Sequence, residues 1–187
     1  QASDFDIERA YKEIPIFKEM VTSAKDAYGI VSLDYQLSGL LNQNMEPVML
    51  SLEGKGVLTL KDIHFKGFKL LNGISSAAGK DGIKDGSVKE VAIKTAIKNN
   101  VMTIERTKMK MAGFRPRFEG QVTLDGQMNL GFRLGLPPFG VLGIPMRITG
   151  TSEKFDIKLG KFKEDDLDTE MDAEDKKLYN ASQSEGQ

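Results

Sequence analysis

The sequence predicts an α+β fold: a strongly curved antiparallel meander of seven or eight strands, partly covered by N-terminal helices and one inserted helix. Two observations predict it. Over most of residues 29–162, apolar residues alternate with polar ones, as in strands with one buried and one solvated face. Two other segments, near residues 5–24 and 68–78, repeat apolar residues every three or four positions, as amphipathic helices do.

Composition limits the function classes. The chain has 187 residues, 40% of them hydrophobic, enough for one domain with a core. It has no cysteine and one histidine, which excludes disulfides and thiolate metal sites and argues against a histidine-ligated zinc. No apolar run reaches the roughly 20 residues that cross a bilayer, so a soluble chain is expected. Because it begins at Gln1 without a charged and apolar leader, we expect a processed product or a fragment of a longer protein.

Residues 1–28 are expected to form two short helices that pack on the sheet. Their apolar residues follow helical spacing, Pro15 breaks or kinks the run, and Gly29 ends it. The apolar positions are Phe5, Ile7, Ala10, Ile14, Phe17, Met20, Val21 and Ala24.

From Gly29 onward the apolar period changes to two. The alternation over residues 31–65 slips in parity near Lys61 and Asp62, which predicts a β-bulge there. A helix is then expected at about residues 67–79, where helical spacing returns and a Gly-rich turn follows.

Strands resume near residue 90. Asn99 and Asn100 are expected to form a tight turn between two strands. The second of these strands begins with Met102 inward and ends with Met111 inward, so its register must shift once, near residues 106–108. A further hairpin turn is expected at Asp125–Gly126.

The stretch LGLPPFGVLGIPMRITG, residues 134–150, is apolar and rich in glycine and proline. It is too short and too interrupted for a membrane insert, and it contains no carboxylate, histidine, serine or lysine to act as nucleophile or base. We expect a wide loop in which three side chains fold back over one end of the sheet. The alternative is that the same residues form an apolar lip at the mouth of a lipid-accepting groove. They are Phe139, Val141 and Leu142.

Residues 163–187 differ in composition from the rest of the chain. Nine acidic residues and three lysines give this segment a net charge of −6, which leaves +5 on residues 1–162. With few apolar residues, we expect an acidic disordered tail. It lacks the spacing and the glycine of an EF-hand loop, so calcium binding is not expected.

The predicted strands present more apolar area than the predicted helices can cover. Either the sheet curls on itself or part of its apolar face receives a guest, and inward methionines suit a guest of variable shape. The expected floor of such a groove is Leu58, Leu60, Phe118, Leu130, Phe132 and Ile148. Four arginines are expected on the polar faces, where they would contact lipid headgroups or a partner, or only keep the face solvated. These are Arg115, Arg117, Arg133 and Arg147.

Three stretches carry a resemblance to a known family. They are SLEGKGVLTLKDIHFKGFKLLNGIS, NNVMTIERTKMKMAGFRPRFEGQVTLDGQMNLGFRLGLPP and GIPMRITGTSEKFDIKLGK, within residues 29–161. In order and content, they resemble the C-terminal region of AsmA-like proteins of Gram-negative bacteria. The resemblance implies a periplasmic β-rich domain, residues 29–162, of a protein anchored in the inner membrane by a segment absent from this chain. It also implies a role in outer-membrane assembly or in lipid transport along an apolar groove.

Residues and resemblance together predict a non-enzymatic module that shields acyl chains on a concave apolar sheet face. The expected partner is a phospholipid or another acyl-chain lipid, with other envelope proteins as possible partners, and no nucleic acid, cofactor or metal is expected. The alternative is a protein-interaction scaffold of the cell envelope with a fully closed core. A hydrolase is disfavoured, because the single histidine, His64, has no partner in the sequence pattern and no paired carboxylates stand out.

Overall fold

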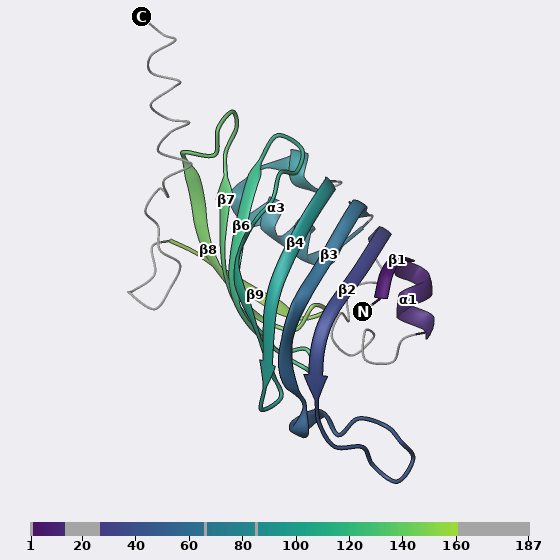
Figure 1. The fold of residues 1–187 in the computed structure, drawn as a ribbon. Helices are drawn as coiled ribbons and strands as arrows, with labels where there is room; N and C mark the ends of the chain where they lie inside the picture. Colours follow the sequence, from purple (N-terminus) through teal and green to yellow (C-terminus); the bar gives the residue numbers. More distant parts are fainter. Residues whose placement is uncertain (1, 14–26, 66, 85, 161–187) are drawn as a thin grey trace, which may run out of the picture.

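Nine strands in chain order make up one antiparallel sheet in the computed structural model, which describes residues 2–13, 27–65, 67–84 and 86–160. Each strand pairs with the next, and β1 and β9 form the two edges (Figure 1). The strands are β1 (Ala2–Asp6), β2 (Ala27–Ser38), β3 (Glu53–Phe65), β4 (Ser87–Lys98), β5 (Val101–Lys108), β6 (Arg115–Thr123), β7 (Met128–Gly135), β8 (Gly143–Gly150) and β9 (Phe155–Leu159). The α-helices are α1 (Ile7–Glu13) and α3 (Lys69–Ala78), with 3₁₀ turns η2 (Met49–Ser51) and η3 (Asp81–Ile83).

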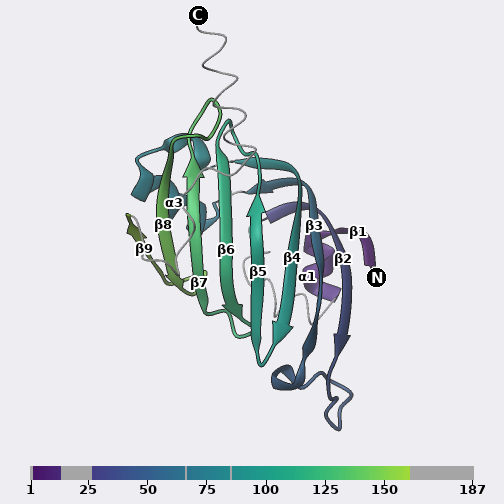
Figure 2. The same cartoon turned by 60° about the vertical axis from the view of Figure 1, so that its left-hand side comes forward.

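The sheet bends toward the side that carries α3, as Figures 1 and 2 show. We call this side the inner face and the opposite side the outer face. The predicted meander is therefore confirmed, but the prediction of seven or eight strands is wrong, because the sheet has nine. The inserted helix is confirmed at Lys69–Ala78, and Gly79 ends it in the left-handed conformation that glycine adopts without cost.

The prediction of a helix over residues 5 and 6 is wrong, since Ala2–Asp6 form strand β1. Phe5 pairs with Val31 across the β1–β2 ladder and packs against the core of the inner face. Pairing with the otherwise open edge of β2 satisfies the backbone groups of both segments, and this overrides the local helical spacing. The helical part begins at Ile7, and the second expected helix falls in residues 14–26, outside the described residues.

Both predicted irregularities of register are present. In the β2–β3 pair, Gly29 alone faces Asp62 and Ile63, so β3 bulges where the parity of the sequence slips. Gly29 is required there, because a Cβ atom at this position would lie 2.7 Å from the carbonyl oxygen of Asp62. In the β5–β6 pair, Glu105 and Arg106 together face the single position 119.

The β4–β5 ladder is short. Only Thr95–Lys98 of β4 pair with Val101–Ile104 of β5, and the two strands diverge beyond this point. The bulge at Glu105 and Arg106 lies where the divergence begins, and bulges bend a strand and increase its twist. The sheet is therefore split between the first half of β4 and the second half of β5.

The core lies on the inner face, where buried side chains from β2 to β8 meet α3 and η3. Leu71 and Ile74 of α3 are buried in it. Gly73 brings the helix close to β9, since a Cβ atom there would lie 2.5 Å from the Phe155 ring. A smaller cluster at the far end of the sheet joins Leu52, Ile97, Met102 and Leu124.

Candidate functional site

All six predicted floor residues lie in or against the core of the inner face. Phe118 and Phe132 are direct cross-strand partners, and so are Leu130 and Ile148. Leu130, Phe132 and Ile148 are buried, with exposed fractions of 9%, 7% and 1%. The alternation of the sequence therefore assigned these residues to the correct face of the sheet.

A cavity of about 250 Å³ opens on the inner face, and we call it the inner-face cavity. Phe68, the residue directly before α3, is part of its lining. Its lining comprises Leu33, Tyr35, Leu58, Phe68, Ile93, Thr95, Met102, Ile104, Phe118, Val122, Gly126, Met128, Leu130 and Ser152. Most of this lining is apolar. An apolar cavity of about 150 Å³ can hold a benzene molecule, so this one has room for part of an acyl chain.

One inward position of β6 beside the cavity has no side chain. Phe118 and Val122 of β6 both line it, and the residue midway between them is Gly120. The cross-strand partners of Gly120, Ile104 on β5 and Leu130 on β7, also line it. A strand contributes a side chain to one face at every second position, so β6 contributes none to the inner face between Phe118 and Val122.

Two of the polar side chains of the cavity are bonded to each other. The hydroxyl oxygens of Tyr35 and Thr95 lie 2.7 Å apart in a hydrogen bond. Burial raises the pKa of Tyr35 above its usual value, and the hydrogen bond with Thr95 opposes this to a lesser extent. With their polar groups paired, these side chains present little unsatisfied polarity to an apolar guest.

The raised pKa of Tyr35 predicts a pH dependence of stability. The folded state disfavours the phenolate, so the contribution of Tyr35 is fully present below pH about 10, where the unfolded chain keeps the proton. It is lost as the pH rises through the folded-state pKa. We expect urea unfolding to show a steeper loss of stability above pH 10 for the wild type than for Tyr35→Phe. Parallel curves for the two proteins would contradict this assignment.

The structure brings only part of the predicted floor to the cavity. Leu58, Phe118 and Leu130 line it, whereas Leu60, Phe132 and Ile148 pack elsewhere on the same face. Sequence reasoning missed Ile93 and Thr95 of β4. Thr95 could have been identified from the sequence, because it is a polar residue at an inward position between two apolar ones, Ile93 and Ile97.

The predicted lip does not lie at the cavity. Phe139, Val141 and Leu142 belong to the loop after β7, and the cavity lies near the start of that strand. Leu142 is 75% exposed, so the prediction that this side chain folds back over the sheet is wrong. The reason is Arg133, which donates hydrogen bonds to the carbonyl oxygens of Gly140 (2.9 Å) and Val141 (2.7 Å) and holds the loop against the outer face.

The predicted arginines lie on the outer face, but not all of them are solvated. Arg147 donates to Asn129, and Arg106, which was not singled out, forms a two-pronged ion pair with Glu119 at 2.9 Å. Arg117 and Arg133 are buried, with exposed fractions of 3% and 8%. The expectation of a uniformly solvated face is therefore wrong at these two residues.

The described residues hold no cluster of three or more histidine, cysteine, aspartate or glutamate side chains suited to a metal ion. In this part of the chain no helix has the length and apolar character needed to cross a membrane. Comparisons of the chain with protein-family models, with curated proteins and with solved structures gave no match.

Proposed function

We propose that the inner-face cavity binds an acyl chain of a lipid. We further propose that the chain is a non-enzymatic periplasmic module of an AsmA-like protein anchored in the inner membrane. In this proposal, the strongly curved sheet shields acyl chains during outer-membrane assembly or lipid transport. The observation that carries it is an apolar cavity of about 250 Å³ on a sheet face that α3 covers only in part.

The chemistry of the lining supports an acyl chain over a polar ligand. None of the described residues of the lining is charged, and the Tyr35 and Thr95 hydroxyls are already bonded to each other. Transfer of apolar surface from water contributes about 25 cal/mol per Å², which suits a hydrocarbon chain and gives little headgroup selectivity. Met102 and Met128 add flexible walls that can adjust to chains of different shape.

The test compares two leucines on the same face of β3. Leu58 lines the cavity and Leu60 does not, and both side chains are half-buried. We expect Leu58→Trp to fill the cavity and to weaken binding of cis-parinaric acid about ten-fold, equivalent to about 1.4 kcal/mol. The matched control, Leu60→Trp, should bind as the wild type does. Native mass spectrometry of the purified protein should likewise show co-purifying phospholipid in the wild type and in Leu60→Trp.

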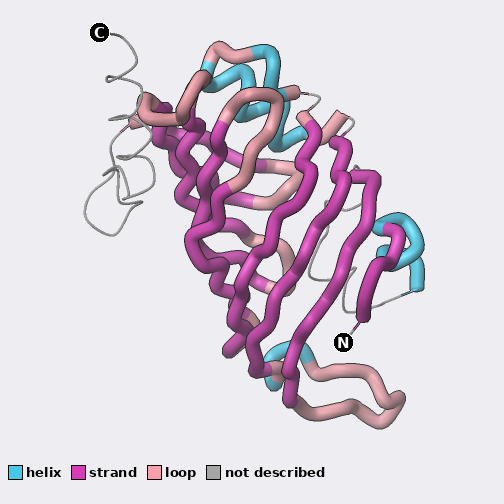
Figure 3. The backbone as a smooth tube through the Cα atoms, turned by 45° about the horizontal axis from the view of Figure 1, so that its top comes forward, coloured by secondary structure: helices cyan, strands magenta, loops and turns pink. Residues whose placement is uncertain are grey.

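Equal binding by both variants would place the acyl chain elsewhere. A well-folded wild type that takes up neither cis-parinaric acid nor phospholipid would reject the lipid function in favour of a protein-interaction scaffold. One observation favours that second candidate. The hairpin loop over residues 39–52 extends beyond the end of the sheet (Figure 3) and exposes Leu40, Leu41, Met45 and Leu50. Exposed apolar side chains gathered on one loop are typical of a protein-docking surface.

A further inference from the structure

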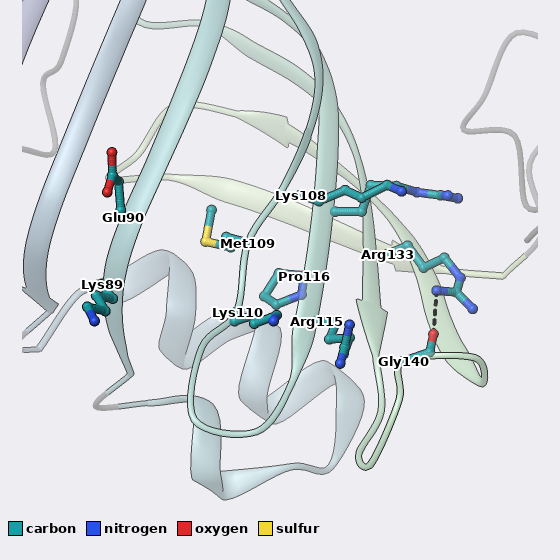
Figure 4. Close-up of a pocket in the computed structure, with 10 residues that line it drawn as sticks. Lys89, Glu90, Lys108, Met109, Lys110, Arg115, Pro116, Arg133 and Gly140 are labelled. Atoms are coloured by element: carbon teal, nitrogen blue, oxygen red, sulfur yellow. Dashed lines mark hydrogen bonds between the residues drawn. The ribbon is translucent and has the colours of Figure 1, made fainter. Parts of the chain in front are cut away.

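The split between β4 and β5 contains a second pocket, of about 440 Å³, which we call the cationic pocket (Figure 4). Among the described residues, six cationic side chains line it, and Glu90 is the only acidic one. The cations are Lys89 of β4, Lys108 of β5, Lys110, and Arg115, Arg117 and Arg133 of β6 and β7. This concentration of one charge contrasts with the near-neutral chain, whose net charge is −1.

Three of these cations form one row across neighbouring strands. Lys108 is the cross-strand partner of Arg117, and Arg117 is the partner of Arg133. Side chains at such positions are about 5 Å apart at Cβ, and like charges directly opposite each other destabilise a sheet. Arg117 and Arg133 are buried, where the local dielectric is lower than in water and the attraction of a bound anion is stronger.

The side chains of the pocket suit a multiply charged anion. Arginine side chains present planar forks of N–H donors that match the oxygens of a phosphate, and the lysines add mobile point charges. Arg133 is already oriented by its bonds to Gly140 and Val141, so its guanidinium loses little freedom on binding. Met109 and Pro116 supply an apolar part of the lining.

We propose that the cationic pocket is a binding site for a phosphate group. The phosphate belongs either to a free phosphate ester or to a lipid headgroup. The two sites are neighbours along β6, because Pro116 lines the cationic pocket and Phe118, two residues on, lines the inner-face cavity. Phosphate binding does not depend on the acyl-chain proposal, and either can fail alone.

The test uses isothermal titration of the full chain with inorganic phosphate, glycerol 3-phosphate and dihexanoyl phosphatidic acid at low salt. We expect all three to bind, and Lys89→Gln and Arg115→Gln each to weaken inorganic phosphate about five-fold or more. Lys94→Gln is the matched control, because Lys94 is an exposed lysine of the same strand β4 outside this pocket. It should change binding less than two-fold, roughly the effect of a distant surface charge. Thermal unfolding of each variant verifies that it is folded.

The lipid source is supported if dihexanoyl phosphatidic acid binds more tightly than glycerol 3-phosphate and the gain disappears in Leu58→Trp. Equal affinities support a free phosphate ester. Absence of saturable binding of inorganic phosphate, or an equal loss in Lys94→Gln, overturns the proposal. Binding seen only after residues 163–187 are deleted also overturns it, because the acidic segment of the chain, with its net charge of −6, would then be the natural occupant.

Discussion

Leu134→Ala is expected to lower the free energy of unfolding by about 3 kcal/mol, with Leu142→Ala as the matched control. Both leucines come from the same apolar stretch of the sequence. Leu134 is fully buried on β7 between its cross-strand partners Pro116 and Ile144, whereas Leu142 is 75% exposed. Truncation at Leu134 removes buried apolar contacts and leaves a cavity that close-packed strands cannot collapse.

Leu142→Ala should change the free energy of unfolding by less than about 0.5 kcal/mol, as expected for an exposed side chain. Urea denaturation of the three proteins at pH 7 measures both values. For a chain of this size, the expected loss at Leu134 corresponds to a decrease in Tm of about 6 to 12 °C. Similar losses for the two variants would mean that Leu142 packs against the protein in solution, and the exposed loop of the structure would be wrong.

Gly120→Ala is expected to cost about 3 kcal/mol of stability, more than an ordinary glycine substitution. Gly120 has a φ of +139°, and a Cβ atom there would lie 2.3 Å from the carbonyl oxygen of Asn129 on β7. Backbone on a paired strand cannot move aside as a flexible side chain can, so β6 and β7 would have to separate. Since Ile104 and Leu130 flank this position, the inner-face cavity should change shape as well.

Gly79→Ala provides the control for backbone conformation alone. Gly79 also has a positive φ, +64°, but no atom of the described residues lies within 4 Å of a Cβ atom built on it. The left-handed conformation costs a non-glycine residue about 1 kcal/mol, so this variant should lose about that much. Urea denaturation measures both losses, and binding of cis-parinaric acid reports the change in the cavity. If the two variants lost the same free energy of unfolding, the close approach of β7 to Gly120 would not contribute to the cost of Gly120→Ala.

Much of the fold follows from local pattern. Val31, Ile63, Ile93 and Ile97 are inward in the structure as the period of two predicts, because a strand places alternate side chains on opposite faces whatever its partner is. The turn at Asn99–Asn100 is equally local, since both residues have positive φ values.

Other features could not be read from the sequence, because they depend on which segments meet. Phe5 lies in a strand because β2 offers an unpaired edge, although the local spacing is helical. Leu142 is exposed because Arg133 of β7, the strand before the loop, donates hydrogen bonds to two loop carbonyls and holds the loop toward the outer face. Hydrophobicity alone predicts burial for Leu142 and contains no information about this bond.

For the candidate site, the alternation of apolar and polar residues predicts the face of the sheet, but the position on that face depends on how the strands pair and pack. Leu58, Phe118 and Leu130 line the cavity, whereas Leu60 lies on the same face of the sheet and does not. The period of two predicts which face a side chain lies on, but it does not predict which residues of the neighbouring strands lie beside it. The cationic pocket exists because β4 and β5 separate beyond the Thr95–Ile104 pair, where the first half of β4 and the second half of β5 are not paired with each other. Where a ladder ends depends on the balance of bulges and pairings in several strands at once, and this balance is a property of the folded sheet.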